Sequence, residues 1–373
     1  MKIAIVCYPT HGGSGVVASE LAMGLAERGH EIHIVSYATP FRLRSFSQNV
    51  LIHEVEVASY PLFKYPPYAL GLATKLVDIN EEYKLDVIHA HYAVPHAASA
   101  FLAREILGSK RLKIITTLHG TDITLVGADT SFHRVIKFSI EQSDGVTAVS
   151  KFLKRRTIEE FEVNKEIRVI YNFVDTSQCI ENSQKCAREK YAPNGEKILM
   201  HASNFRPVKR VSDVVRIFDL VRKEMPTKLL LVGEGPERLF VQQLVKELKL
   251  SDHVWFLGHQ DYIEHLLSCA DLFLLPTEQE SFGLVALEAH SCGVPVVGAI
   301  TGGLPEVVTD GETGFLLPVG DIGAMAHKSL DLLTNDEMFA QYQRSAKQRA
   351  QKCFDRSLII PEYEAYYREV LDR

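Results

Sequence analysis

The 373-residue sequence has few cysteines, no long apolar run and no marked excess of either charge. Its six cysteines show no C-x-x-C spacing, which favours reduced thiols over a disulfide framework or a zinc cluster. A net charge of −6 supplies no basic field for nucleic acid. No apolar run approaches the ~18 residues of a membrane span, and no signal-peptide pattern opens the chain. These absences predict a soluble, cytoplasmic protein without a nucleic-acid partner or stable membrane association.

Several catalytic motifs are also missing. There is no Asp-x-Asp, a common manganese-binding motif, and no G-x-S-x-G, the nucleophile turn of many serine hydrolases. The glycine-rich segment 12–15 meets neither the G-x-G-x-x-G fingerprint nor the P-loop pattern. His89 and His91 alternate, but no further metal ligands are evident near them. We therefore expect no metal site.

What is present is a regular alternation of short β-branched runs with longer amphipathic stretches, which is typical of βα units around a parallel sheet. In the first half, strands are predicted at residues 2–6, 31–36, 51–57, 87–90, 113–118, 145–149 and 167–170. After a polar stretch from about 172 to 195, further strands are predicted at 198–200, 228–232, 254–257, 272–275, 295–297 and 315–317.

This pattern predicts an α/β protein of two facing, doubly wound Rossmann-like domains with a cleft between them. The expected bounds are 1–171 and 172–355. A terminal helix, 356–373, carries several tyrosines and is expected to return to the first domain. Ligands of such sheets bind at the carboxyl ends of the strands, so functional residues are expected in the loops that follow strands.

The strongest local motif is the segment 278–288, which follows a predicted strand. Glu280 and Glu288 are eight residues apart, about 12 Å at the rise of a helix. That separation is too long for a glycosidase pair, which needs roughly 5–9.5 Å, but it suits the two ends of an extended ligand such as a nucleotide sugar. Amides around 281–284 would face negative charge at a helix N-terminus. Two solvated helix glutamates are the alternative interpretation.

Other polar segments follow predicted strands. Arg206, Lys209 and Arg210 come after the first strand of the second domain, where they could hold a diphosphate or form a solvated basic loop. The glycines of 12–15 would let a ligand approach the backbone, or serve only a tight turn. The basic run 151–156 is interpreted as a solvated helix face rather than a membrane anchor.

Together these motifs resemble the retaining glycosyltransferases of family four, which have the GT-B fold, over nearly the whole chain. The residues that carry the likeness are Glu280-x7-Glu288 and the segments 231–236 and 302–306. More narrowly, segments 7–9, 12–15, 64–68, 91–92, 119–124 and 203–206 resemble the subgroup that glycosylates L-malate in bacillithiol biosynthesis. The resemblance implies UDP-N-acetylglucosamine as donor and L-malate as acceptor. We expect no cofactor and no requirement for a metal.

The resemblance also implies roles for individual residues. Glu288 would hold the ribose hydroxyls, Glu280 the sugar hydroxyls and Lys209 the diphosphate, while His119 would contact the sugar near its 6-hydroxyl. Further donor contacts would come from Gly13, Ser14, Asn204, Ser281, Phe282, Gly283 and Leu284. The related mycothiol-forming enzymes suggest acceptor contacts from Lys64, Tyr92, Thr121 and Arg134, with Gly15 beside them.

One position departs from the family. Many members carry an arginine five residues before the lysine, and Asn204 stands at that position here. We expect Arg206 to supply the second phosphate contact instead. Because no carboxylate is predicted beside the anomeric carbon, a front-face substitution is favoured, in which the β-phosphate of UDP accepts the proton of the acceptor hydroxyl. Lys209, Arg206, Glu280 and His119 are the predicted catalytic residues.

Three other functions remain open. The chain could transfer sugar to a lipid or polysaccharide, act as a nucleotide-sugar 2-epimerase, or bind a UDP-sugar as a non-catalytic sensor. Homo-oligomer formation is compatible with the sequence, which does not set the oligomeric state.

Overall fold

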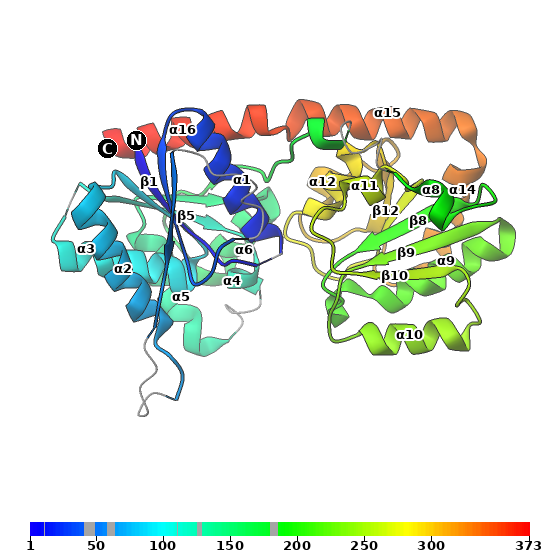
Figure 1. Cartoon of the computed structure of the whole chain (residues 1–373), viewed down its shortest axis with the longest axis horizontal. Coiled ribbons are helices and arrows are strands. Elements are labelled where there is room, and N and C mark those ends of the chain that lie inside the picture. Colours follow the sequence, from blue (N-terminus) through cyan, green and yellow to red (C-terminus); the bar gives the residue numbers. More distant parts are fainter. Residues whose placement is uncertain (11, 41–48, 58–63, 110, 125–128, 180–185) are drawn as a thin grey trace. The chain divides into compact units, whose positions relative to one another are not determined.

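The computed structural model describes residues 1–10, 12–40, 49–57, 64–109, 111–124, 129–179 and 186–373 (Figure 1). The chain forms two compact units. Unit 1 comprises Met1–Asn172 and Ser357–Arg373, and unit 2 comprises Phe173–Arg356. These bounds differ by one residue from the expected 171/172 and 355/356 divisions. In the described part of the chain, no helix combines the length and hydropathy that crossing a bilayer requires.

Unit 1 contains a seven-stranded parallel sheet with the order β3-β2-β1-β4-β5-β6-β7. Its central strands are almost entirely buried, as is usual for parallel sheets covered on both faces, although they include buried histidines and threonines. The strands are β1 Lys2–Val6, β2 Glu31–Ser36, β3 Val50–Glu54, β4 Val87–His91, β5 Lys113–Leu118, β6 Gly145–Ala148 and β7 Arg168–Val169. The helical segments are α1 Gly13–Glu27, α2 Tyr68–Tyr83, η1 Ala93–Ala97, α3 Ala98–Leu107, α4 Thr121–Thr124, α5 Thr130–Gln142 and α6 Lys151–Phe161.

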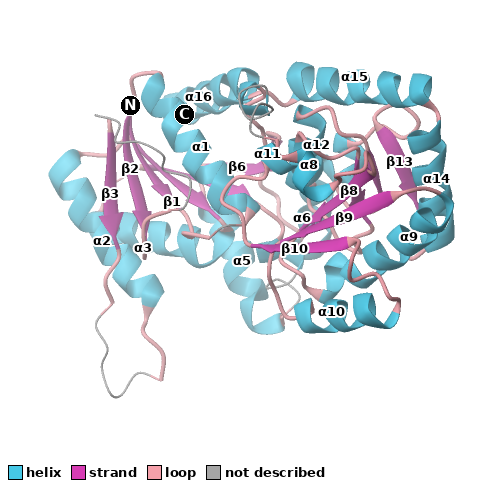
Figure 2. Cartoon of the chain, turned by 45° about the vertical axis from the view of Figure 1, so that its right-hand side comes forward, coloured by secondary structure: helices cyan, strands magenta, loops and turns pink. Residues whose placement is uncertain are grey.

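Unit 2 repeats this topology with six parallel strands in the order β10-β9-β8-β11-β12-β13. They are β8 Lys197–Ala202, β9 Thr227–Val232, β10 Val254–Gly258, β11 Leu272–Leu275, β12 Val296–Ala299 and β13 Gly314–Leu317. The helical segments are α8 Arg188–Tyr191, η2 Pro207–Lys209, α9 Val211–Glu224, α10 Arg238–Glu247, α11 Glu264–Leu267, α12 Leu284–Ser291, α13 Leu304–Val307, α14 Ile322–Thr334 and α15 Asp336–Cys353. Figure 2 shows α9 and α10 on one side of β8–β10, and α11 and α12 on the other. Both units therefore have the Rossmann-like strand order, which confirms the predicted fold class.

The terminal helix α16, Arg356–Asp372, begins at the predicted residue 356, and from Ser357 onward it belongs to unit 1. The Tyr366 hydroxyl accepts a hydrogen bond from the Val146 amide at 2.9 Å. The Tyr367 hydroxyl lies 2.7 Å from His89 Nδ1, and both side chains are fully buried. Tyrosines of α16 therefore reach the sheet of unit 1 at β4 and β6.

The expectation that all cysteines are reduced thiols is wrong for four of them. Disulfides join Cys179 to Cys292 and Cys186 to Cys269, with Cα atoms 5.2 and 5.5 Å apart. Cys7 and Cys353 are free. The bonded residues are 113 and 83 positions apart. Spacing between neighbouring cysteines therefore carries no information about these pairs, which the tertiary fold of unit 2 creates.

Candidate active site

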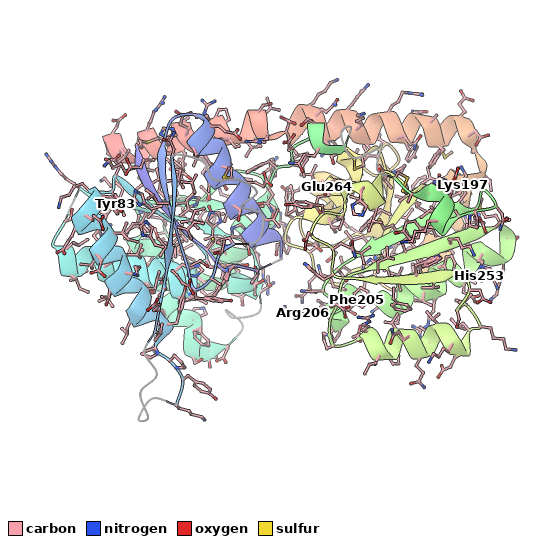
Figure 3. All side chains as sticks on the ribbon, in the orientation of Figure 1. Tyr83, Lys197, Phe205, Arg206, His253 and Glu264 are labelled. Carbon is pink, nitrogen blue, oxygen red and sulfur yellow. A yellow bond between two sulfur atoms is a disulfide. The ribbon has the colours of Figure 1, made fainter. Side chains whose placement is uncertain are left out.

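The segment after β8 carries two predicted catalytic residues, Arg206 and Lys209, and brings Lys209 against a third, Glu280. Phe205 is fully buried in a left-handed backbone conformation (φ 37°), and the exposed Arg206 follows it (Figure 3). The chain then turns through η2, and Lys209 Nζ donates a hydrogen bond to Glu280 Oε2 at 2.7 Å. The lysine and glutamate side chains are 20% and 15% exposed. The pair is therefore largely shielded from solvent, yet still accessible.

The backbone around Glu280 is held by the turn at Gly302 and Gly303. A Cβ at Gly302 (φ 55°) would lie 1.8 Å from the Glu280 carbonyl oxygen, so no larger residue fits there without a backbone shift. The Gly303 amide donates to the same oxygen at 2.8 Å. This contact explains why the segment 302–306 accompanies Glu280 in the motif.

The prediction that one helix carries both Glu280 and Glu288 is wrong for Glu280. α12 begins only at Leu284, because Gly283 adopts φ 99° and interrupts helical geometry. Glu280 therefore lies in the loop before the helix, and the 12 Å helical rise does not describe the pair. Glu288 lies within α12, 9% exposed, while Phe282 packs into the core at 2% exposure. Ser281, which lies between Glu280 and Phe282 in the sequence, is partly buried.

The other two cations of this loop differ from each other. Arg210 contacts Glu278 Oε1 and Asp213 Oδ2, each at 2.5 Å, and these carboxylates raise the pKa of its guanidinium. Arg206 is exposed, as is the neighbouring Asn204. Arg210 is thus held by two carboxylates of its own unit, whereas Lys209 pairs with one, Glu280.

Two glycines after β9 explain a further part of the motif. A Cβ at Gly233 (φ 118°) would lie 1.8 Å from the Ser203 carbonyl oxygen, and one at Gly235 would lie 2.0 Å from that of Asn204. The segment 231–236 therefore packs directly against the backbone of the loop that carries Asn204 and Arg206. These glycines shape the candidate site without presenting a side chain to it.

A second group of predicted residues lies in unit 1, at the carboxyl ends of the adjacent strands β1, β4 and β5. The Tyr92 hydroxyl donates to Ser14 Oγ at 2.6 Å, and its ring centroid lies 5.3 Å from that of His119. Burial raises the pKa of Tyr92 to about 12, although its hydrogen bonds to Ser14 and Thr121 oppose the shift. Gly13 begins α1, and a Cβ at Gly15 would lie 2.3 Å from the Thr10 carbonyl oxygen. The structure thus gathers Gly13, Ser14, Gly15, Tyr92, His119 and Thr121.

Two predicted acceptor residues are not part of this group. Lys64 is exposed, with its ammonium 5.5 Å from the Tyr65 ring centroid, and Arg134 is exposed on α5. In the described segments, neither forms a hydrogen bond with Tyr92 or Thr121. Their proposed roles therefore rest on the resemblance alone.

Asp122, which was not among the predicted site residues, is buried close to Tyr92. Its carboxylate accepts hydrogen bonds from the Ala93 amide at 3.1 Å and the Gly120 amide at 3.0 Å. Asp122 thereby joins the loop after β4, where Tyr92 has φ 97°, to the loop after β5. Burial raises the pKa of this carboxyl to about 6. The polar run after β5 was the signal that could have pointed to Asp122.

The His89-x-His91 alternation belongs to a buried hydrogen-bonded set. His89 Nε2 lies 2.7 Å from Thr117 Oγ1, and His91 Nδ1 lies 2.8 Å from His119 Nε2. Burial lowers the pKa of His89 and of His119 to about 3. These rings are therefore neutral at physiological pH. Across the described segments, no three His, Cys, Asp or Glu side chains are arranged to hold a metal ion.

Comparison with known proteins places this architecture in a family. The model "Glycosyltransferase Family 4" matches residues 11–178, and the model "Glycosyl transferases group 1" matches residues 183–349. The chain is 48% identical to N-acetyl-alpha-D-glucosaminyl L-malate synthase of Bacillus anthracis over 372 residues, covering 100% of this chain and 97% of that protein.

Solved structures share the fold at lower identity. Sucrose-phosphate synthase from Thermosynechococcus elongatus has a TM-score of 0.81 and 21% identity, covering 100% of this chain and 99% of that one. Anabaena HepE in complex with UDP and glucose has a TM-score of 0.82 and 22% identity, covering 98% and 99%. From the full-length identity and the two Rossmann-like units, the chain belongs to glycosyltransferase family 4 and is a glycosyltransferase of GT-B architecture.

Proposed function

We propose that this enzyme transfers N-acetylglucosamine from UDP-N-acetylglucosamine to the hydroxyl of L-malate, with retention of anomeric configuration. The observation that carries the proposal is the 48% identity, over the whole chain, to a protein named for this product. The reaction would take place in the cytoplasm and open the synthesis of bacillithiol. Unit 2 would supply most contacts to the nucleotide sugar, and unit 1 would bind the acceptor and add donor contacts from Gly13, Ser14 and His119.

The donor roles fit the surroundings of each residue. Lys209 is a cation whose single ion-pair partner in the described structure is Glu280, so a diphosphate could take the place of that carboxylate. Arg206 is exposed and would supply the second cation that the family places at Asn204. Glu288 would hold the ribose hydroxyls and Glu280 those of the sugar. The amides of 281–284, at the start of α12, would face the negative charge.

The acceptor roles follow from the chemistry of malate, which has two carboxylates and one hydroxyl. Lys64 and Arg134 are exposed cations, and neither forms an ion pair with a described residue. Tyr92 and Thr121 offer hydroxyl groups beside Ser14 and Gly15. A basic pocket with hydroxyl donors is a suitable receptor for a small dicarboxylate.

The proposed chemistry is a front-face substitution. The bond from the anomeric carbon to the β-phosphate oxygen breaks, and a bond from that carbon to the malate hydroxyl oxygen forms on the same face. The hydroxyl proton passes to the departing β-phosphate. Lys209 and Arg206 would stabilise the negative charge that grows on the phosphate, and His119 would orient the sugar. The step needs no oxidant, cofactor or metal.

The test is the release of UDP from UDP-N-acetylglucosamine, with and without L-malate, in the presence of EDTA. Malate-dependent release that survives the chelator supports a metal-independent malate transferase. Succinate, which has both carboxylates but lacks the hydroxyl, is the matched control and should give no release. Release without any acceptor would instead indicate an epimerase or hydrolase. Tight binding of the UDP-sugar without release in any mixture would leave another acceptor or a sensor.

A further inference from the structure

His91 and His119 form a hydrogen-bonded pair at the carboxyl ends of β4 and β5. Their Nδ1 and Nε2 atoms are 2.8 Å apart, and the rings stack at an interplanar angle of 18° with centroids 5.0 Å apart. His91 is fully buried, whereas His119 is partly exposed. His91 thus stands behind the residue that the proposed function assigns to the donor sugar.

Only one proton can lie between the two facing nitrogens, because a hydrogen bond joins one donor to one acceptor, and each neutral imidazole carries a single N–H. If His119 Nε2 donated it, the proton of His91 would lie on Nε2. In the described structure that atom is buried and has no hydrogen-bond partner. Buried N–H groups without an acceptor are rarer in proteins than acceptors without a donor. The geometry therefore favours His91 Nδ1 as the donor.

We propose that His91 is a positioning residue that fixes the tautomer of His119. By donating from Nδ1 to His119 Nε2, it leaves the His119 proton on Nδ1, so that His119 offers an N–H to an oxygen of the donor sugar. The sugar contact, though not the tautomer, rests on the proposed function.

Neighbouring residues contact both the backbone and the ring of His91. His96 Nδ1 lies 2.5 Å from the His91 carbonyl oxygen, and the His89 ring centroid is 4.4 Å from that of His91. His89 is itself held by Tyr367 of α16 and by Thr117 of β5. A ring held from several sides can select one tautomer of its neighbour, whereas a mobile ring could not.

The first test locates the proton directly and needs no turnover. Long-range ¹H–¹⁵N correlation spectra of the full-length protein distinguish a protonated from an unprotonated ring nitrogen. The His119 signals are assigned among the 15 histidines by their loss in His119→Asn. We expect a proton on Nδ1 of His119 in the wild type, and a mixture of tautomers in His91→Leu. A proton on Nε2 of wild-type His119 overturns the proposal, whatever reaction the enzyme catalyses.

The second test uses UDP-N-acetylglucosamine and its 6-deoxy analogue, and compares kcat/KM for the two donors. His91→Leu should lower their ratio by about 5- to 10-fold, because a neutral hydrogen bond to the 6-hydroxyl weakens. His91→Asn, whose amide lies near the position of Nδ1, should restore most of the ratio, whereas His91→Gln should not. An unchanged ratio in both His91→Leu and His91→Gln would overturn the sugar contact.

A control separates this effect from general loss of packing. His33 is equally buried in β2 of the same sheet, and its hydrogen bonds go to His53 and Glu31. His33→Leu should lower thermal stability while leaving the ratio of the two donors unchanged. Absence of wild-type turnover with malate would refute the proposed function, and the tautomer would still be decided by the spectra.

Discussion

Replacing Lys209 with alanine tests the central electrostatic contact of the candidate site. Lys209 donates to Glu280 at 2.7 Å in the structure, and the proposed function gives its charge to the leaving diphosphate. Lys209→Ala should therefore affect turnover much more than folding. The two effects can be estimated separately.

The cost in stability follows from the ion pair. Exposed pairs contribute about 0.2–1 kcal/mol, but this one is largely shielded, and a charge-assisted hydrogen bond contributes about 1.5–3 kcal/mol. For a domain of this size each kcal/mol lowers Tm by about 2–4 °C. Loss of a preorganised contact to developing charge lowers kcat by about 10²–10³. Most of the protein should therefore remain folded while turnover is nearly lost.

The assay measures malate-dependent UDP release and thermal unfolding on the same preparations. Lys223→Ala is the matched control, because Lys223 donates to Asp219 at the same 2.7 Å on the exposed surface of α9. It should change neither kcat nor Tm appreciably. Wild-type turnover in Lys209→Ala, together with a lowered Tm, would show that the lysine only stabilises the loop and would refute its role at the phosphate.

Three further predictions follow from the same structure. Glu280→Gln removes the carboxylate that pairs with Lys209, and in the proposed function that carboxylate competes with the diphosphate for the lysine. Calorimetry should therefore show UDP binding up to about tenfold tighter, while turnover falls. Weaker UDP binding in this variant would contradict the competition between Glu280 and the diphosphate. Thiol titration of the unreduced, unfolded chain should detect only Cys7 and Cys353, and six reactive thiols would disprove the bonds. Reduction should lower Tm, because closing a loop of 83 or 113 residues contributes about 4.5–5 kcal/mol in the chain-entropy model. Burial lowers the pKa of four histidines to about 3–4: His89, His96, His201 and His290. Because the unfolded chain then binds more protons than the folded one, the free energy of unfolding should fall as the pH drops from about 6.5 to 4, by up to about 1.4 kcal/mol per pH unit for each histidine. Urea denaturation at pH 7 and 5.5 checks this, and equal urea midpoints at the two pH values would contradict it.

Strands were the feature that local sequence predicted best. The short β-branched runs bounded by turn residues predicted β1, β2, β5 and β11 with their observed bounds. These features depend on side-chain burial and on backbone preferences of a few adjacent residues. Such preferences are written into each segment, so no knowledge of distant contacts is needed to recognise them.

Contacts between distant segments were decided by the tertiary structure. α12 starts at Leu284, after a loop held against Gly302, and the disulfides join residues more than eighty positions apart. The pairing of His91 with His119 requires β4 and β5 to be neighbours, with His91 opposite Thr117. Local sequence patterns were enough to predict the alternation of strands and helices and the kinds of residue at the strand ends. Which of those residues meet was determined by strand order and register, because only packing of the whole sheet brings separate loops within hydrogen-bond distance.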